Sequence, residues 1–307
     1  MNAPLPMLDG VGPSCQWLPE GHWKTVLDFL QQQFPSVTTE TWASRMTKGE
    51  VVDETGRRID EASPYRIGAC VFYYRELTTE PSIPFTERIL YEDEHILVAD
   101  KPHFLPVLPA GRFLHETLLV RLRKQEKHAD LVPVHRLDRE TAGVVLFSLN
   151  PETRGLYTSL FRERKAQKVY EALAPSASKL NFPHTRHSRI VKGEPFFRMK
   201  EVPGEPNSET QIDLLREPAE GSLYRIVPVT GRKHQIRVHL AALGIPIIND
   251  KLYPQLTAPR ELNGVDDFSR PLKLLAKSLS FQDPLSGREH YFETSRTLRE
   301  SDDTTKP

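Results

Sequence analysis

The residues best suited to chemistry lie in one short stretch, His135–Gly143, which leads into the apolar run Val144–Phe147. Within this stretch Asp138 follows Arg136 and precedes Arg139. Positive charge nearby keeps a carboxylate ionised, and an ionised carboxylate can act as a nucleophile or stabilise positive charge. An Asp beside Arg is also common in structural ion pairs and turns, so these residues alone leave both interpretations open.

Two further segments carry functional side chains at regular spacing. Lys168–Leu173 alternates as a strand does and carries Tyr170 on one face, although a tyrosine on a strand is usually a packing residue. Thr230–Leu240 begins with a Gly turn and continues into a predicted helix that ends before Gly244. That helix carries Arg237, which could partner a buried carboxylate for chemistry or simply tie two segments together.

The histidines of the last segment raise the alternative of a metal site. His234 and His239 are five residues apart, whereas the helical zinc pair is four apart, and no cysteine cluster accompanies them. The chain also lacks a glycine-rich phosphate-binding loop. The sequence therefore predicts no metal and no cofactor.

Together these segments resemble the signature motifs of the RluA-type RNA pseudouridine synthases, which isomerise uridine within RNA. His-Arg-Leu-Asp followed by Thr-x-Gly matches at residues 135–143, Lys-x-Tyr-x-Ala at 168–172, and Gly-Arg-x-His-Gln-Ile-Arg-x-His at 231–239. A strand ending in Lys101-Pro102 and the block Gly-x-Pro-Ile-x-x-Asp-x-x-Tyr at 244–253 also match, the latter as a mostly structural element. The matches occur in order and span about residues 86–293.

The resemblance implies a role for each matched residue. It implies that Asp138 is the nucleophile and that Arg237 pairs with it. It implies that Tyr170 stacks on the target base and removes the proton from carbon 5 of uracil. Arg136 would hold the nucleotide that is flipped out of the RNA, or its displaced partner. The other positions expected to bind substrate are His135, Arg139, Thr141, Lys168, Arg232, His234 and Gln235.

Three positions depart from the family pattern. Lys233 stands where the family usually has a small polar residue. Ala142 stands where the family usually has Ser or Thr, and Leu275 stands where it commonly has His. Because the nucleophile, tyrosine and arginine motifs are intact, we expect activity to survive and substrate recognition to be affected.

The chain is predicted to contain two folded parts. Short strands interleaved with single helices predict an α+β fold around a mixed, largely antiparallel sheet for the larger part. The expected divisions are an irregular N-terminal arm at 1–22, a small module at 23–78, a linker at 79–85, a catalytic domain at 86–295 and a polar tail at 296–307.

The small module reads as two short helices followed by a hairpin. Apolar residues recur at helical spacing from Val26 to Phe34, and Thr38 or Thr39 can cap a second helix. This order resembles a compact RNA-binding module named after a small-subunit ribosomal protein. The resemblance implies RNA contacts from Arg45, Lys48, Arg57 and Arg58. The alternative is a structural subdomain with scattered surface charge.

Helices in the larger part are predicted from apolar periodicity and capping residues. Leu114–Lys124 has the pattern of an amphipathic helix. Asn150 is expected to cap a helix that begins at Pro151 and ends near Arg164, with Leu156, Leu160 and Phe161 facing inward.

The overall composition is that of a soluble globular protein, with 38% hydrophobic and 27% charged residues. The sequence contains no apolar run of about 18 residues, which a membrane span would need, and no recognisable secretory signal. We therefore expect a cytoplasmic protein in which Cys15 and Cys70 are reduced thiols.

The charge distribution is more informative than the formal net charge of zero. Residues 154–200 contain eleven Lys or Arg and three acidic residues. Such a stretch is commonly a solvated face, but here it adjoins the candidate active site, which favours a surface that faces phosphates.

The sequence thus predicts a monomeric pseudouridine synthase that acts on structured RNA, ribosomal or transfer. One alternative is a non-catalytic RNA-binding or ribosome-assembly factor on the same fold. The other is a hydrolase such as a glycosidase, which would need a second acidic residue near Asp138 as proton donor.

Overall fold

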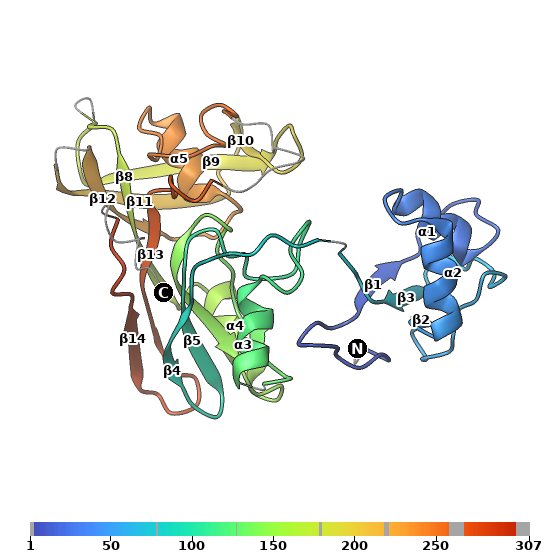
Figure 1. The fold of residues 1–307 in the computed structure, drawn as a ribbon. Helices are drawn as coiled ribbons and strands as arrows, with labels where there is room; N and C mark the ends of the chain where they lie inside the picture. The colour runs from blue at the N-terminus through green and yellow to red at the C-terminus, as the bar shows by residue number, and fades with distance from the viewer. Residues whose placement is uncertain are drawn as a thin grey trace. The chain divides into compact units, whose positions relative to one another are not determined.

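The computed structural model describes residues 3–77, 79–126, 128–177, 180–217, 221–257 and 267–298. The chain divides into two compact units (Figure 1). Unit 1 comprises residues 1–80, 110–115 and 120–129, and unit 2 comprises residues 81–109, 116–119 and 130–307. Helix α3 (Leu118–Glu126) contributes residues to both units.

Unit 1 is a small sheet covered by two helices. The elements are β1 (Ser14–Trp17), α1 (Val26–Gln33), α2 (Thr39–Lys48), β2 (Val51–Asp53) and β3 (Cys70–Tyr73). The antiparallel sheet has the order β1-β3-β2. Both helices begin at a threonine cap: Thr25 and Asp28 form a reciprocal capping box, and Thr38 accepts a hydrogen bond from the Thr41 amide. Phe29, Leu30 and Trp42 are buried between the helices and the sheet.

The N-terminal arm differs from expectation in two ways. Residues 14–17 are not irregular but form the edge strand β1. Its alternate residues are exposed, so its sequence lacks the run of apolar residues that marks a buried strand. The prediction that both cysteines are reduced thiols is wrong as well, because Cys15 and Cys70 form a disulfide between β1 and β3. The two cysteines are 55 positions apart in sequence, and only the pairing of their strands brings them together.

Unit 2 is built on one large sheet with the order β10-β9-β11-β12-β8-β13-β7-β5-β4; β14 pairs with β13 and β6 pairs with β7. The pair β7–β13 is parallel, and the other pairs in this sheet are antiparallel. This confirms the predicted α+β fold around a mixed, largely antiparallel sheet. The elements are β4 (Arg88–Glu92), β5 (Ile96–Lys101), β6 (Val132–Pro133), β7 (Ala142–Ser148), α4 (Arg154–Arg162), β8 (Gln167–Ala174), β9 (His184–Lys192), β10 (Met199–Val202), β11 (Ser208–Arg216), β12 (Ser222–Pro228), α5 (Gln235–Ala242), β13 (Leu274–Gln282) and β14 (Glu289–Glu293).

Two helices cover different parts of this sheet (Figure 1). Helix α5 buries Ile236 and Leu240 in a core with residues of β8, β11, β12 and β13. Helix α4 buries Tyr157 and Leu160 in a core with residues of β5, β7, β13 and β14. Residues at the end of α4, in β8 and at the start of α5 line one cavity, and this arrangement positions the candidate site.

The helix boundaries differ from the sequence pattern by one turn. Helix α3 begins at Leu118, not Leu114. Helix α4 begins at Arg154, because the Asn150 carboxamide oxygen accepts from the Glu152 amide and forms a turn ahead of the helix. Leu156 was expected inside but is 42% exposed. Tyr157 is buried instead, and its hydroxyl donates to Asp283, which fixes this face of α4 toward the sheet.

The C-terminal segment is not a purely polar tail where the structure describes it. Leu298 is buried, and Arg296 forms an ion pair with the buried Asp100. Residues 299–307 of the expected tail lie outside the described residues. Among the helices that the structure describes, none has the length and apolar composition needed to cross a membrane.

Candidate active site

Asp138 lies in the turn that leads into β7, and a buried lysine fixes the backbone around it. The Thr141 amide donates to the Asp138 carbonyl at 3.1 Å and closes the turn. The Lys101 ammonium donates to the carbonyls of Pro102, Leu105 and Arg139 at 3.0, 2.8 and 3.0 Å. Burial lowers the pKa of Lys101 to about 7, but three carbonyl acceptors match the three protons of an ammonium group.

Arg237 connects Asp138 to a second carboxylate, Asp250. The Arg237 Nη1 atom lies 3.2 Å from Asp138 Oδ2. On its other side the guanidinium donates to Asp250 through Nε at 2.8 Å and through Nη2 at 2.7 Å. The Asp250 side chain is fully buried and also accepts from the amides of Leu252 and Tyr253. Asp250 thus holds the guanidinium in one orientation toward Asp138.

The electrostatic surroundings keep Asp138 ionised. Burial alone would raise the pKa of its carboxyl group, but His234 and Arg237 more than offset that effect and lower it below the ordinary value of 3.8. Burial opposes the charge of Arg237 too, yet its bonds to Asp250 raise its pKa. At neutral pH the site therefore contains a carboxylate and a guanidinium.

The two atoms that approach Asp138 do so at the same carboxylate oxygen. Arg237 Nη1 is 3.2 Å and His234 Nε2 is 3.8 Å from Oδ2. The structure shows no hydrogen bond or ion pair at Oδ1 within its described residues. The carboxylate is about a quarter exposed, so Oδ1 is the oxygen left for a reacting partner.

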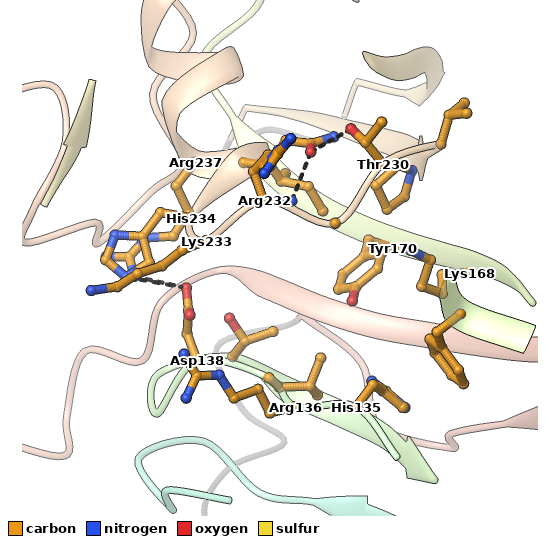
Figure 2. A pocket seen from close by; sticks show the side chains of 18 of the residues that line it. His135, Arg136, Asp138, Lys168, Tyr170, Thr230, Arg232, Lys233, His234 and Arg237 are labelled. Atoms are coloured by element: carbon orange, nitrogen blue, oxygen red, sulfur yellow. Dashed lines mark hydrogen bonds and ion pairs between the residues drawn. The ribbon is translucent and has the colours of Figure 1, made fainter. Parts of the chain in front are cut away.

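Asp138 lines a cavity of about 590 Å³, a size suited to a nucleotide (Figure 2). Tyr170 from β8 lies across the cavity from Asp138, with its hydroxyl pointing into it (Figure 2). Burial, reinforced by the charge of Asp138, raises the pKa of Tyr170, so its hydroxyl is protonated at neutral pH.

The cavity wall is strongly cationic. Within the described part of the chain, Asp138 is the one carboxylate that lines it. The lining cations are Arg136, Arg162, Arg164, Lys168, Arg232, Lys233 and Arg237. Three of them belong to the basic stretch 154–200, so the structure joins that stretch to the site. Such a wall suits a polyanion that also presents an uncharged group to Asp138.

Several residues expected to bind substrate line the cavity, where their side chains can contact a bound molecule. Arg136 and Arg232 are exposed at its edge, and Arg232 Nε donates to the Asn207 carbonyl. Lys168 faces the cavity from β8, and burial lowers its pKa. Thr141 also lines the cavity but is itself buried.

Other residues of this set support the loops that form the cavity. His135 stacks on Phe161 with ring centroids 4.6 Å apart, and its Nε2 accepts from the Leu146 amide. Burial lowers the pKa of His135 to about 3, so the ring is neutral. Gln235 accepts from Thr230 and the Arg232 amide.

The Gln235 side-chain amide group also donates two hydrogen bonds through Nε2, to the Glu209 carbonyl and to Thr210 Oγ1. All four of its hydrogen-bonding positions are occupied, so Gln235 fixes the turn before α5.

Arg139 and Arg45 are not where the sequence suggested. Arg139 does not line the cavity; it donates to the Phe104 carbonyl at 3.0 Å, because the residue after Asp138 points away from it. In unit 1 Arg45 is buried, pairs with Glu76 at 2.9 Å and stacks on Trp42, so it does not lie on the surface where the expected contact with RNA requires it. The other predicted basic residues of this module, Lys48, Arg57 and Arg58, are exposed.

Two of the three departures from the family pattern lie away from the cavity. Neither Ala142 nor Leu275 lines it; both are buried in one apolar cluster, so neither can contact a substrate there directly. Lys233, the third departure, does line the cavity.

Two site residues were missed by the sequence reasoning. Asp250 and Tyr253 belong to the block 244–253, which was read as mostly structural, yet Asp250 holds Arg237 and Tyr253 bonds to His234. Their fixed spacing within a matched block was the available signal. No group of three or more metal-ligating side chains occurs among residues whose placement is described.

Comparison with known proteins gives a consistent result. The model of a family described as RNA pseudouridylate synthase matches residues 95–242. An uncharacterised RNA pseudouridine synthase of Synechocystis is 32% identical over 240 residues, which is 74% of this chain and 79% of that protein. The dual-specificity RNA pseudouridine synthase RluA of Vibrio vulnificus is 34% identical over 67% of this chain and 81% of its own length.

Solved structures agree with these sequence matches. The human RNA pseudouridylate synthase domain containing 1 superposes with a TM-score of 0.54 at 25% sequence identity. The match covers 71% of this chain and 86% of the human structure. The similarity thus extends over most of unit 2.

Proposed function

The chain belongs to the RluA-type RNA pseudouridine synthase family, and on this premise we propose that Asp138 is the nucleophile that converts uridine to pseudouridine in structured RNA. The observation that carries the proposal is an ionised carboxylate, the one found among the described residues that line a cation-rich cavity of nucleotide size. A uridine inside a folded RNA must leave its stack to enter such a cavity. Cations at the edge would hold the flanking phosphates while the uncharged base meets Asp138.

The reaction conserves every atom, so it needs no redox partner. Asp138 Oδ1 bonds to ribose C1′ as the bond between uracil N1 and C1′ breaks, and the detached base rotates. A bond then forms between C5 and C1′ as the Oδ1–C1′ bond breaks and releases the carboxylate. C5 loses its proton and N1 ends with one. Arg237 keeps Asp138 ionised before the attack and stabilises it again when it is released.

We assign Tyr170 to the uracil ring. Its place across the cavity from Asp138 lets the phenol ring pack on the base. Because its raised pKa keeps the hydroxyl protonated, Tyr170 can accept the C5 proton only after passing its own proton on. Protonation of N1 offers a destination for that proton.

The substrate is proposed to be ribosomal or transfer RNA, held in part by unit 1. Lys48, Arg57 and Arg58 are exposed, and the Arg58 side chain lies against Gly49 at the end of α2. These cations would bind phosphates without reading sequence, so their contribution to affinity should fall as salt rises.

The glycosidase alternative is less well supported by the site. Hydrolysis of this kind uses two carboxyl groups about 5–9.5 Å apart. Asp138 has no such partner among the described residues that line the cavity, and Asp250 is taken up by Arg237. Release of free uracil from RNA would nevertheless reverse this ranking.

The test is pseudouridine mapping of ribosomal and transfer RNA from cells with and without the gene. A carbodiimide-dependent reverse-transcription stop should vanish on deletion and return with the wild type. It should not return with Asp138→Asn, although that variant should keep its affinity for RNA.

The matched control is Asp213→Asn, which changes a carboxylate in an exposed ion pair with Arg225. It should restore the stop. If Asp138→Asn also restores it, Asp138 is not the nucleophile. If no stop depends on the gene, the non-catalytic RNA-binding factor becomes the better interpretation.

A further inference from the structure

A chain of three groups leads from the backbone of β10 to the candidate nucleophile. The Met199 amide donates to Tyr253 Oη at 2.7 Å. The same Oη lies 2.8 Å from His234 Nδ1. The other ring nitrogen, His234 Nε2, faces Asp138 Oδ2 at 3.8 Å. The His234 side chain is only 7% exposed, so water has little access to it.

The number of donors and acceptors on each group determines which atom donates at each of these contacts. Burial raises the pKa of Tyr253, so its hydroxyl carries one proton at neutral pH. Because Oη already accepts from Met199, donating that proton to His234 Nδ1 leaves no hydroxyl proton unpaired. A neutral imidazole that accepts at Nδ1 must carry its proton on Nε2, the nitrogen that faces Asp138.

Two independent features hold the imidazole in place. The Tyr253 ring packs against two guanidinium groups, whose carbons lie 5.1 Å (Arg198) and 5.5 Å (Arg237) from its centroid. His234 itself has a left-handed backbone with φ of 56° at the start of α5. A side-chain-bearing residue in that region costs free energy and persists where its surroundings require it.

We propose that Tyr253 and His234 are positioning residues that keep an N–H group directed at Oδ2 of Asp138, so that Oδ1 is the attacking oxygen. This inference rests on the proposed function for its kinetic consequences only. At 3.8 Å the contact is longer than a hydrogen bond, so it acts through the N–H dipole until the carboxylate moves during the reaction. The opposite tautomer would present a lone pair to the carboxylate and repel it.

The charges around His234 agree with a neutral ring. It faces Asp138 from the signature loop, Arg237 from α5, Lys233 from its own loop, and Asp250 with Tyr253 from the following segment. Burial dominates these influences and lowers the pKa of His234 to about 4. Loss of the Tyr253 hydroxyl removes a donor that favours the neutral ring, so the pKa of His234 should then rise.

The first experiment reads the tautomer without using activity. Long-range proton–nitrogen correlation spectra of the nitrogen-15-labelled full chain distinguish Nε2–H, Nδ1–H and charged imidazoles. His234 is assigned by loss of its signals in His234→Asn, since Asn tolerates the left-handed backbone. We expect the neutral Nε2–H form at pH 7. An Nδ1–H or charged ring in the wild type would overturn the proposal, whether or not the protein modifies RNA.

The second experiment measures the consequence in Tyr253→Phe, which keeps the ring and removes the hydroxyl. We expect kcat to fall about tenfold at neutral pH, the scale of one hydrogen bond, with KM for RNA unchanged. The acidic limb of the kcat profile should move to higher pH, because a charged His234 weakens the nucleophile. The control is Tyr224→Phe, whose buried hydroxyl donates to the Pro175 carbonyl. If both variants give the same pH profile, Tyr253 is merely structural and the proposal fails.

Discussion

Replacing Asp250 by Asn changes one buried oxygen into an amide group and leaves the size of the side chain unchanged. The two Arg237 contacts, at 2.7 and 2.8 Å, lose one acceptor and gain a donor that faces a donor. Both side chains are essentially inaccessible to water, so solvent cannot replace the lost contact. Removing one partner of a buried pair typically costs about 3–5 kcal/mol. For a folded unit of this size, about 2–4 °C of Tm per kcal/mol predicts a fall of roughly 6–20 °C.

The assay is thermal unfolding of the full chain by calorimetry at low and high salt. The matched control is again Asp213→Asn, since the Asp213 and Arg225 side chains are 39% and 38% exposed and their contact is 3.3 Å. An exposed pair contributes about 0–1 kcal/mol and is screened by salt, so the control should change Tm by less than about 4 °C. Below its Tm, Asp250→Asn should also lose most of its kcat because Arg237 is no longer held toward Asp138. Equal Tm shifts for the two variants would refute the claim that Asp250 holds Arg237.

Two further predictions concern stability. Burial is the main cause that lowers the pKa values of His103 and His135 to about 3, so between pH 6.5 and 3 only the unfolded chain takes up their protons. These two residues together should lower the free energy of unfolding by roughly 4 kcal/mol from pH 7 to 5, and His234, with a pKa of about 4, should add to that loss. Urea titrations at both pH values measure this loss, and an unchanged free energy would contradict it. Gly143→Ala should destabilise unit 2 severely, because φ is +115° and the added Cβ would clash with the Ala276 carbonyl group. Gly155→Ala, inside helix α4 where nothing lies within 4 Å, should instead raise Tm slightly, by about 1–4 °C.

The sequence was most predictive where residues close in the chain do the work. The turn containing Asp138, the strand carrying Tyr170 and the helix carrying Arg237 each have a local pattern of turn residues or apolar period. These patterns identified the elements and the α+β class. The matches to family motifs, in their order along the chain, then linked these distant segments, which no local pattern could do. The structure brings Asp138, Tyr170 and Arg237 to one cavity.

The sequence was least predictive where a long-range partner decides a side chain's environment. Arg45 looks like a surface cation on α2, but it is buried against Trp42 and pairs with Glu76, 31 positions later. Asp250 looks like a loop residue until Arg237 reaches it from α5. Cys15 and Cys70 show no spacing that indicates a disulfide, since only the pairing of β1 with β3 creates one. In each case the missing information was tertiary, because local sequence encodes periodicity and caps but not partners.

The departures from the family pattern at Ala142 and Leu275 are best understood as one change. Ala142 and Leu275 are direct partners in the parallel pair β7–β13, so a hydroxyl and an imidazole at these positions would lie opposite one another. Replacing only one of them would leave the other as a buried polar group without its partner, at a cost of about 1–3 kcal/mol, whereas replacing both by apolar groups can be nearly neutral. Leu298 completes an apolar cluster with this pair, while the neighbouring Leu274 lines the cavity. Alternation along β13 directs Leu275 to the opposite face of the sheet, and the paired change therefore alters the core beneath the site without removing a group that can meet RNA.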